Sequence, residues 1–259
     1  MSLHDTQNEP DFRNLPIDRV GVKQVRFPIQ VRDKNDTTLQ NTIATITLTV
    51  DLPHHFKGTH MSRFIEVLHT HGTQLHVSNM CDILQQLRHR LKAQSAYADF
   101  EFPFFLRKKA PATQTPGLMD YTARFQSTQS ENENDFIVTV KVPVTTLCPC
   151  SKAISTQGAH NQRGLVTLST RSEPAMWLED MIELVEQSAS CSLYSILKRP
   201  DEKMVTEHAY ENPVFVEDLV RNVATRCEAI PSISWYQVEA ENFESIHNHN
   251  AYALIEKTT

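Results

Sequence analysis

The sequence predicts an α+β protein in which helices cover one face of antiparallel strands. Strand-like runs, in which apolar and polar residues alternate, occur in pairs along the chain. Stretches with apolar residues at helical spacing follow the first pair in each half. The order strand, strand, helix, helix, strand, strand therefore occurs twice, with little residue similarity between the halves. Helices on one face of an antiparallel sheet are typical of the α+β class.

The first half follows a polar and acidic lead-in, residues 1–12, that we expect to be disordered. We assign residues 13–131 to a first unit and residues 132–259 to a second. The six elements of the first unit are expected over residues 20–31, 39–52, 61–71, 79–92, 97–106 and 119–127.

The second half repeats the order around a segment rich in polar residues, 145–160. This segment joins two strands, where a rigid sheet can hold a loop open to solvent. A sheet of this kind has open edges, so edge-to-edge assembly into a closed oligomer is physically attractive. The six elements of the second unit are expected over residues 136–144, 164–170, 176–197, 214–229, 232–240 and 251–256.

Composition is ordinary for a globular chain, and it argues against two classes of partner. The 259 residues are 40% hydrophobic and 22% charged, with a formal net charge of −6. A net negative charge disfavours general nucleic-acid or anionic-membrane binding, although a local basic pocket for phosphates stays compatible with it. The N-terminus resembles neither a signal nor a transit peptide, and we expect a cytoplasmic protein without membrane or nucleic-acid partners.

Five cysteines form an odd set without framework spacing, which indicates reduced thiols. Cys191 and Cys227 lie in helical patterns, and we expect them, like Cys81, to be small buried core residues. Cys148 and Cys150 differ because they flank a proline in a polar loop. These two are either surface thiols or part of a functional site.

Cys148 and His160 have the chemistry of ligands to a catalytic metal. Such a site keeps about three protein ligands and leaves a position for water. The segment between these residues is long enough to fold back and bring them together. Cys150 is close enough to compete as the thiolate, but the C-x-C spacing is tight for both thiols on one metal.

A second polar cluster near the C-terminus contains Glu244, His247 and His249. Two histidines separated by one residue point to the same face of an extended segment. Imidazoles beside a metal could transfer protons, because their ordinary pKa is near ~6.5. The alternative is a plain polar turn before the last strand.

Two further segments are ambiguous. Glu202 lies in a proline-broken connection between helices, where a solvated loop is as good an interpretation as a site. His60 and Arg63 lie at a helix start, which is a natural anion-binding position. The alternative is that Thr59 or Ser62 caps the helix there.

Six stretches span nearly the whole chain after residue 12: RNLPIDRVGVK (13–23), KGTHMSRF (57–64), LCPCSK with GAHNQRG (147–164), LKRPDEK (197–203), YENPVFVED (210–218) and ENFESIHNHNAYA (241–253). Together they resemble the type IB GTP cyclohydrolase I family. This family implies a tunnelling fold (T-fold) of two tandem β-β-α-α-β-β units per chain, with sheets that assemble into barrels in a homotetramer. Its members hydrolyse GTP at a cyclic amidine C–N bond, giving formate and 7,8-dihydroneopterin triphosphate for tetrahydrofolate and, in some bacteria, queuosine synthesis.

The resemblance also implies roles for individual residues. One divalent metal, Zn²⁺, Mn²⁺ or Fe²⁺, is expected on Cys148, His160 and Glu202, with Cys150 as the fallback thiolate. A metal-bound water would attack C8 of the purine. His247 and His249 would handle protons at N7 and on the ring-opened intermediate.

The substrate contacts are the remaining implied roles. A buried carboxylate should accept hydrogen bonds from guanine N1–H and the 2-amino group; Glu217 is the first choice and Glu244 the second. The triphosphate is expected to contact Arg63, Lys152, Arg199 and His60.

Two other functional classes remain compatible with the residues. A different enzyme on the same fold, such as a nitrile reductase with a cysteine nucleophile and NADPH or a pyruvoyl-pterin synthase, could use Cys148 or Cys150. A purine-binding module without turnover is the non-catalytic alternative. His160 and the C-terminal histidine pair favour metal-dependent hydrolysis.

Overall fold

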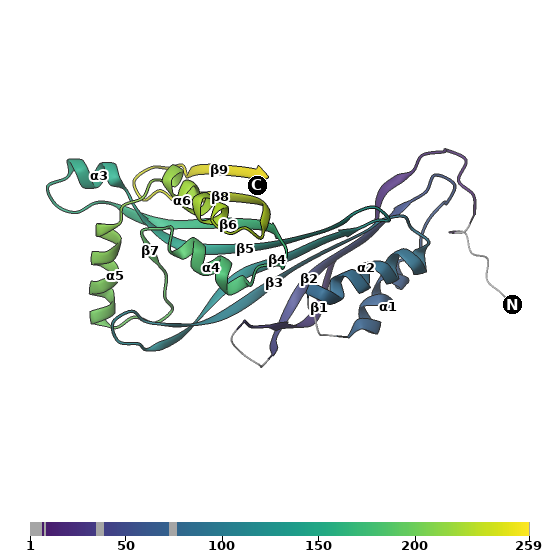
Figure 1. Cartoon of the computed structure of the whole chain (residues 1–259), viewed down its shortest axis with the longest axis horizontal. Helices are drawn as coiled ribbons and strands as arrows, with labels where there is room; N and C mark the ends of the chain where they lie inside the picture. Colours follow the sequence, from purple (N-terminus) through teal and green to yellow (C-terminus); the bar gives the residue numbers. More distant parts are fainter. Residues whose placement is uncertain (1–6, 8, 35–38, 73–76, 259) are drawn as a thin grey trace. The chain divides into compact units, whose positions relative to one another are not determined.

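The computed structural model describes residues 7, 9–34, 39–72 and 77–258 (Figure 1). Its residues fall into two compact units. Unit 1 takes residues from Met1–Phe102 and Arg124–Ile137, and unit 2 takes residues from Pro103–Ala123 and Val138–Thr259. The strands are ordered β1-β2-β3-β4-β5-β6-β8-β9, with β7 beside β5. The tandem division at residues 131 and 132 rests on element order and stays a prediction.

Unit 1 is an antiparallel sheet with two helices packed on one face. β1 (Ile17–Arg32) pairs with β2 (Leu39–Leu52), which pairs with the first part of β3 (Ala96–Lys109). α1 (Ser62–His71) and α2 (Val77–Leu91) lie side by side along the sheet (Figure 1). Alternate strand residues and one stripe of each helix form the core, including Ile46, Leu48, Phe100, Phe64, Val67, Met80, Leu84 and Leu87.

The elements predicted in this half are confirmed, with one error in burial. Cys81 is exposed, although we expected it in the core. Its neighbour Met80 and the later Ile83 and Leu84 mark the inward face of α2. Cys81 is one helical position, about 100°, from Met80 and therefore points away from that face.

Unit 2 contains β6 (Asn161–Ser172), β8 (Ile233–Asn242), β9 (Ala251–Thr258) and, from residue 138 onward, β5 (Asn134–Leu147), in antiparallel pairs. Residues 103–109 of β3 and residues 116–123 of β4 (Pro116–Gln129) also belong to unit 2. α4 (Leu178–Glu186) and α6 (Val216–Glu228) bury their apolar stripes against the sheet. The core of this unit includes Val140, Val142, Val144, Val166, Leu168, Met181, Leu219, Val223, Cys227, Tyr236 and Val238.

The helix expected over residues 176–197 is wrong in its second half, because α4 ends at Glu186. Residues Cys191–Ser192 form the short strand β7 on β5, so Cys191 is buried in a strand rather than a helix. After the helix, serines occur at alternate positions, 188, 190 and 192, and serine side chains compete for backbone hydrogen bonds. Ser190 Oγ accepts a hydrogen bond from Leu147 N at 3.0 Å, which fixes the extended course.

Two helices were not predicted. α3 (Pro149–Ile154) lies inside the segment expected to be a loop, and α5 (Arg199–Glu211) lies where we expected a broken connection. Each has a proline in its first turn, Pro149 and Pro200. Proline is tolerated there because the first-turn N–H groups lack helical partners anyway. The broken connection expected around Pro200 is therefore wrong.

The helices of the described residues include none long and apolar enough to cross a membrane.

Candidate active site

Cys148 lies at the point where β5 ends and α3 begins. Its backbone is extended, with φ −70° and ψ 118°, and it is the N-cap of α3. The Sγ atom accepts a hydrogen bond from Ser151 N at 3.4 Å, and the side chain is half-buried. Pro149 in the first turn fixes the direction in which the chain leaves the strand. The thiol is therefore held at a defined position at the end of a rigid sheet.

His160 is brought next to Cys148 by the pairing of β5 with β6. Leu147 is opposite Asn161, and Cys148 N donates to His160 O at 3.1 Å. Ser151 closes the loop, because its hydroxyl donates to Cys148 O and accepts from His160 N, both at 3.1 Å. Two residues twelve positions apart thus begin and end one tightly bonded loop.

The imidazole of His160 is oriented by a residue that we did not predict. Gln162 Oε1 lies 3.0 Å from His160 Nδ1, while Gln162 Nε2 donates to the buried Thr146 Oγ1 at 3.0 Å. Because the amide oxygen faces Nδ1, that nitrogen carries the proton and Nε2 keeps its lone pair. This tautomer suits a histidine that binds a metal through Nε2. His160 directly precedes β6 and Gln162 is the second residue of that strand, a spacing that gives no specific signal in the sequence.

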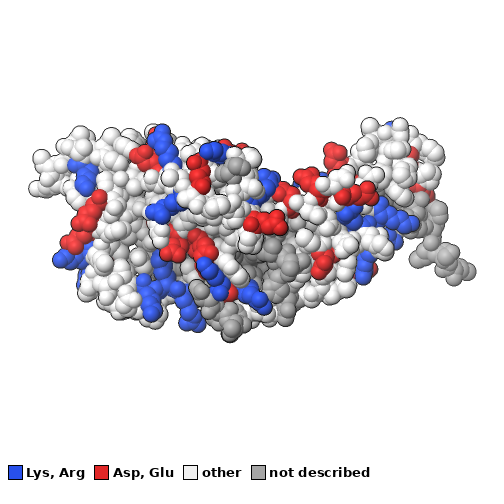
Figure 2. Space-filling view, in the orientation of Figure 1, with Lys and Arg blue, Asp and Glu red and all other residues white. Residues whose placement is uncertain are grey.

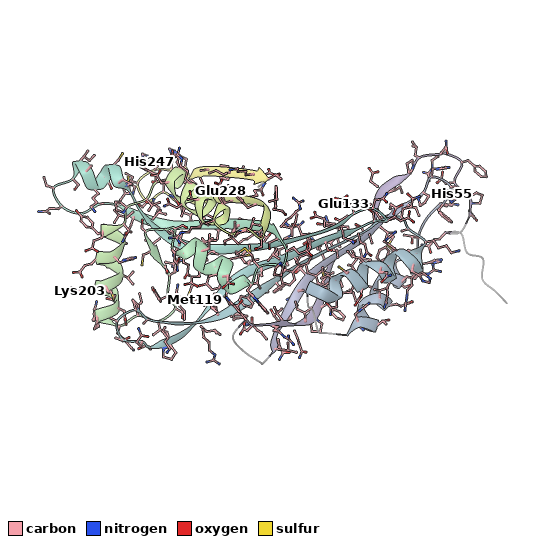
Figure 3. The ribbon with its side chains drawn as sticks, viewed as in Figure 1. His55, Met119, Glu133, Lys203, Glu228 and His247 are labelled. Carbon is pink, nitrogen blue, oxygen red and sulfur yellow. The ribbon has the colours of Figure 1, made fainter. Side chains whose placement is uncertain are left out.

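The C-terminal polar cluster reaches the same place from the connection between β8 and β9. Ser245 Oγ lies 3.3 Å from His160 Nδ1, and Glu244 beside it is half-buried. The rings of His247 and His249 are exposed and stack, with centroids 5.1 Å apart and 17° between their planes. Figure 3 shows His247 on this connection at the surface of the unit.

A close approach of two strands anchors the start of this connection. Gly164 is opposite Asn242, and Phe243 N donates to Arg163 O at 2.9 Å. A Cβ atom on residue 164 would lie 2.6 Å from Asn242 Oδ1, so only glycine fits without movement. The strand pairing therefore continues up to the cluster that contacts His160.

Lys152, Arg199 and Glu202 have partners within the chain. Lys152 donates to Tyr210 O, and its Nζ lies 4.4 Å from the centre of the Tyr210 ring, which ties α3 to α5. Arg199 Nη1 lies 3.0 Å from Glu202 Oε2 in the exposed first turn of α5. A phosphate or metal at these residues would have to compete with these contacts.

Glu217, the first choice for the guanine carboxylate, is not buried within the single chain, and its role stays a prediction. It is in the first turn of α6 and is exposed, whereas we expected a buried side chain. Cys150, the fallback thiolate, is also exposed. Of the carboxylates proposed for guanine, only Glu244 is partly covered within the single chain.

His60 and Arg63 belong to unit 1. His60 is half-buried, and Arg63 Nη1 donates to Arg90 O at 3.3 Å. The N-cap of α1 is Met61, and it makes no side-chain capping bond. The alternative in which Thr59 or Ser62 caps this helix is therefore wrong.

The predicted metal ligands are brought together only in part. Over residues 7, 9–34, 39–72 and 77–258, no group of three or more His, Cys, Asp and Glu side chains is placed to hold a metal. Cys148 and His160 share one loop, but Glu202 on α5 does not complete a three-ligand set with them.

On the face shown in Figure 2, basic and acidic side chains are interspersed, in line with the net charge of −6.

Comparisons with known proteins agree over nearly the whole chain. A family model described as type I GTP cyclohydrolase folE2 matches residues 3–253. A protein of Akkermansia muciniphila named GTP cyclohydrolase FolE2 is 61% identical, with 98% of this chain and 97% of the relative covered. A protein of the same name from Syntrophus aciditrophicus is 55% identical, with 98% and 99% covered.

Solved structures with a similar fold are urate oxidases. Uricase from Arthrobacter globiformis has a TM-score of 0.51 at 10% identity, covering 93% of this chain and 92% of that one. Urate oxidase from Bacillus sp. TB-90 has a TM-score of 0.53 at 6% identity, covering 94% and 100%. At such identities the likeness concerns the fold alone. These proteins have the tunnelling fold, and the predicted α+β fold class is confirmed.

Proposed function

Because the chain belongs to the type I GTP cyclohydrolase folE2 family, we propose that it hydrolyses GTP to 7,8-dihydroneopterin triphosphate and formate. The family is the type IB family that the sequence resembled, so that resemblance is confirmed. The structural observation that best supports the proposal is the bonded loop that holds Cys148 beside His160. In this loop the His160 imidazole is oriented by the contact of its Nδ1 with Gln162 Oε1, so that Nε2 keeps a lone pair.

The proposal includes one divalent metal at this loop. Cys148 Sγ and His160 Nε2 would be two ligands, Glu202 the third, and Cys150 the alternative thiolate. A sulfur, nitrogen and oxygen set suits Zn²⁺, and the carboxylate also admits Mn²⁺ or Fe²⁺. When bound, such a metal supplies Lewis-acid activation of water for attack on the purine ring. Gln162 would contribute by fixing the ring orientation of His160.

The other chain residues have distinct parts in the proposal. His247 and His249 would exchange protons with N7 and with the ring-opened intermediate, because imidazole titrates near neutral pH. Glu244 or Glu217 would accept hydrogen bonds from guanine N1–H and the 2-amino group. The triphosphate would contact four residues that carry a positive charge or lie at a helix start: Arg63, Lys152, Arg199 and His60.

We also propose a cytoplasmic homotetramer whose product enters tetrahydrofolate or queuosine synthesis. Support for an assembly comes from the incomplete ligand set, since Glu202 lies apart from Cys148 and His160 within one chain. β1 and β9 end the strand order, so each has an edge on which another copy could pair. A residue from a second copy, or a rearranged α5, would complete the site.

The test is to remove metal from the purified protein, add back Zn²⁺, Mn²⁺ or Fe²⁺ separately, and measure formate and neopterin released from GTP. We expect turnover to return with at least one metal and to be absent without any. A folded oligomer that binds GTP but releases no formate with any metal would contradict the proposal. It would favour the purine-binding module, whereas NADPH-dependent reduction of a nitrile would favour the reductase.

A further inference from the structure

Asp201 is a charged residue with no exposed surface, and the proposed function gives it no part. It is the third residue of α5, and its side chain is 0% exposed. Oδ1 accepts hydrogen bonds from Ala112 N and Thr113 N, both at 2.8 Å. Oδ2 accepts from Thr113 Oγ1 at 2.7 Å and from Lys198 N at 2.9 Å. All these groups belong to unit 2.

The four donors explain why a carboxylate is tolerated at this position. Burial disfavours a charged side chain unless hydrogen bonds replace the lost water, and here three backbone N–H groups and one hydroxyl do so. Because backbone N–H groups can only donate, these contacts suit an ionised carboxylate, whose oxygens only accept. Removal of the Asp201 carboxylate would leave the backbone N–H groups that it accepts from without a partner, which lowers the stability of the fold.

These bonds join the start of α5 to the tip of the hairpin formed by β3 and β4. The same hairpin is held nearer its base by Glu186, the last residue of α4. Glu186 Oε1 accepts from Lys108 Nζ at 2.7 Å and from Tyr121 OH at 2.9 Å. The segment from residue 187 to residue 201 is therefore fixed to the hairpin at both ends. Asp201 is the fixed point next to α5.

The residues around Asp201 are those that the proposed function needs. Arg199 and Glu202 are in the same helical turn, and both are exposed. An exposed first turn frays unless its N–H groups are satisfied. Asp201 satisfies Lys198 N from within that turn while its other oxygen is bound to the hairpin.

We infer that Asp201 is a positioning residue, which fixes the first turn of α5 on the hairpin tip and so sets the positions of Glu202 and Arg199. The inference rests on the proposed function in its last step, because Glu202 and Arg199 matter only if they contact metal and triphosphate. The fixed hairpin contact itself is independent of any activity.

The experiment compares Asp201→Ala and Asp201→Asn with Asp218→Ala in the full-length protein. Asp218 is the matched control, since it is the third residue of α6 and its ion pair with Arg221, at 3.1 Å, is on the surface. Hydrogen exchange is measured at the amides of residues 112, 113 and 201–203. Metal affinity is measured by competition with a chelating dye, at a temperature where circular dichroism shows every variant folded.

We expect Asp201→Ala to speed exchange at these amides at least ~10-fold and to weaken metal binding ~10- to 100-fold, as for other residues that orient ligands. In Asp201→Asn the exchange rates and the metal affinity should lie between those of Asp201→Ala and wild type. Excess metal should restore part of the kcat that Asp201→Ala loses. Asp218→Ala should match wild type in both measurements. Should Asp201→Ala fail to fold, Asp201→Asn and Thr113→Val carry the test, with smaller changes in the same direction.

Wild-type metal affinity in folded Asp201→Ala, or unchanged exchange at the hairpin amides, would overturn the inference. Failure of the proposed function is a separate outcome, because it is seen as absent GTP turnover in the wild type with every metal. The exchange result holds in either case.

Discussion

The Ser245 hydroxyl lies 3.3 Å from Nδ1 of His160, so the connection between β8 and β9 meets the Cys/His loop at the imidazole itself. Gln162 Oε1 is 3.0 Å from the same nitrogen and is fixed in turn by Thr146. The shorter contact and the buried support indicate that Gln162 sets the tautomer. Ser245 is the exposed second partner, and it links His160 to the segment that bears Glu244, His247 and His249.

The first prediction separates the two candidate thiolates. Cys148→Ala should abolish metal binding and GTP turnover, because Cys148 is held half-buried at the N-cap of α3 beside His160. Cys150→Ala should keep stoichiometric metal, because Cys150 is exposed. His160→Ala should behave like Cys148→Ala. Metal content of the purified variants measures this, and stoichiometric metal in Cys148→Ala would refute the ligand assignment.

The second prediction concerns the support of His160. Gln162→Leu should lower metal affinity ~10- to 100-fold, because the imidazole loses the acceptor that fixes its tautomer and orientation. Ser245→Ala should have a smaller effect, since Gln162 still accepts from Nδ1. Dye competition measures both affinities. An equal or larger loss in Ser245→Ala would show that Ser245, not Gln162, orients the ring.

The third prediction is the effect of filling the space at Gly164. Gly164→Ala should lower the free energy of unfolding by ~1–3 kcal/mol, because the new Cβ would meet Asn242 Oδ1 at 2.6 Å in a packed strand pair. Gly58→Ala is the control, where the nearest atom, Gln7 Cγ, is 3.5 Å away. We expect that change to stay within ~0.5 kcal/mol. Urea unfolding of the two variants measures the difference, and equal stabilities would contradict it.

The parts of the site that the sequence predicted are those that depend on local pairing. Cys148 and His160 flank a segment between two strands, so strand pairing alone brings them together. Gln162 could not be selected in advance, because a glutamine two residues after a histidine is an unremarkable sequence pattern. Its role depends on Thr146, which is buried across the strand pair.

The errors in the fold have a common physical origin in tertiary contacts. Pro200 is in the first turn of α5, whose start is stabilised by Asp201 from within and by Thr113 from a distant hairpin. The helix expected to run to residue 197 stops because Ser190 bonds to Leu147 on another strand. Such partners are remote in sequence, so periodicity does not indicate them. The position of Glu202 depends in the same way on a contact beyond its own helix, between the neighbouring Asp201 and Thr113.

The fourth prediction is a loss of stability at alkaline pH to which two buried acids, Tyr236 and Cys227, contribute. Burial, and then the hydrogen bond to and charge of Glu228, raise the pKa of Tyr236 from 10.0 to about 12. Burial chiefly raises the pKa of Cys227 from 9.0 to about 12. Both groups stay protonated in the folded protein at pH values where the unfolded chain has already released the protons. Stability is therefore fully present below pH 9 and falls as pH rises toward about 12.

Melting temperature measured between pH 8 and pH 12 tests this relationship. Tyr236→Phe should flatten the fall above pH 10, and Cys227→Ala should flatten it from pH 9 upward. Tyr236→Phe also removes the 3.0 Å hydrogen bond to Glu228, so its stability at pH 8 should drop by about 1 kcal/mol. The slope, not the level at pH 8, is therefore the diagnostic quantity. Parallel curves for wild type and both variants would show that other groups cause the alkaline loss.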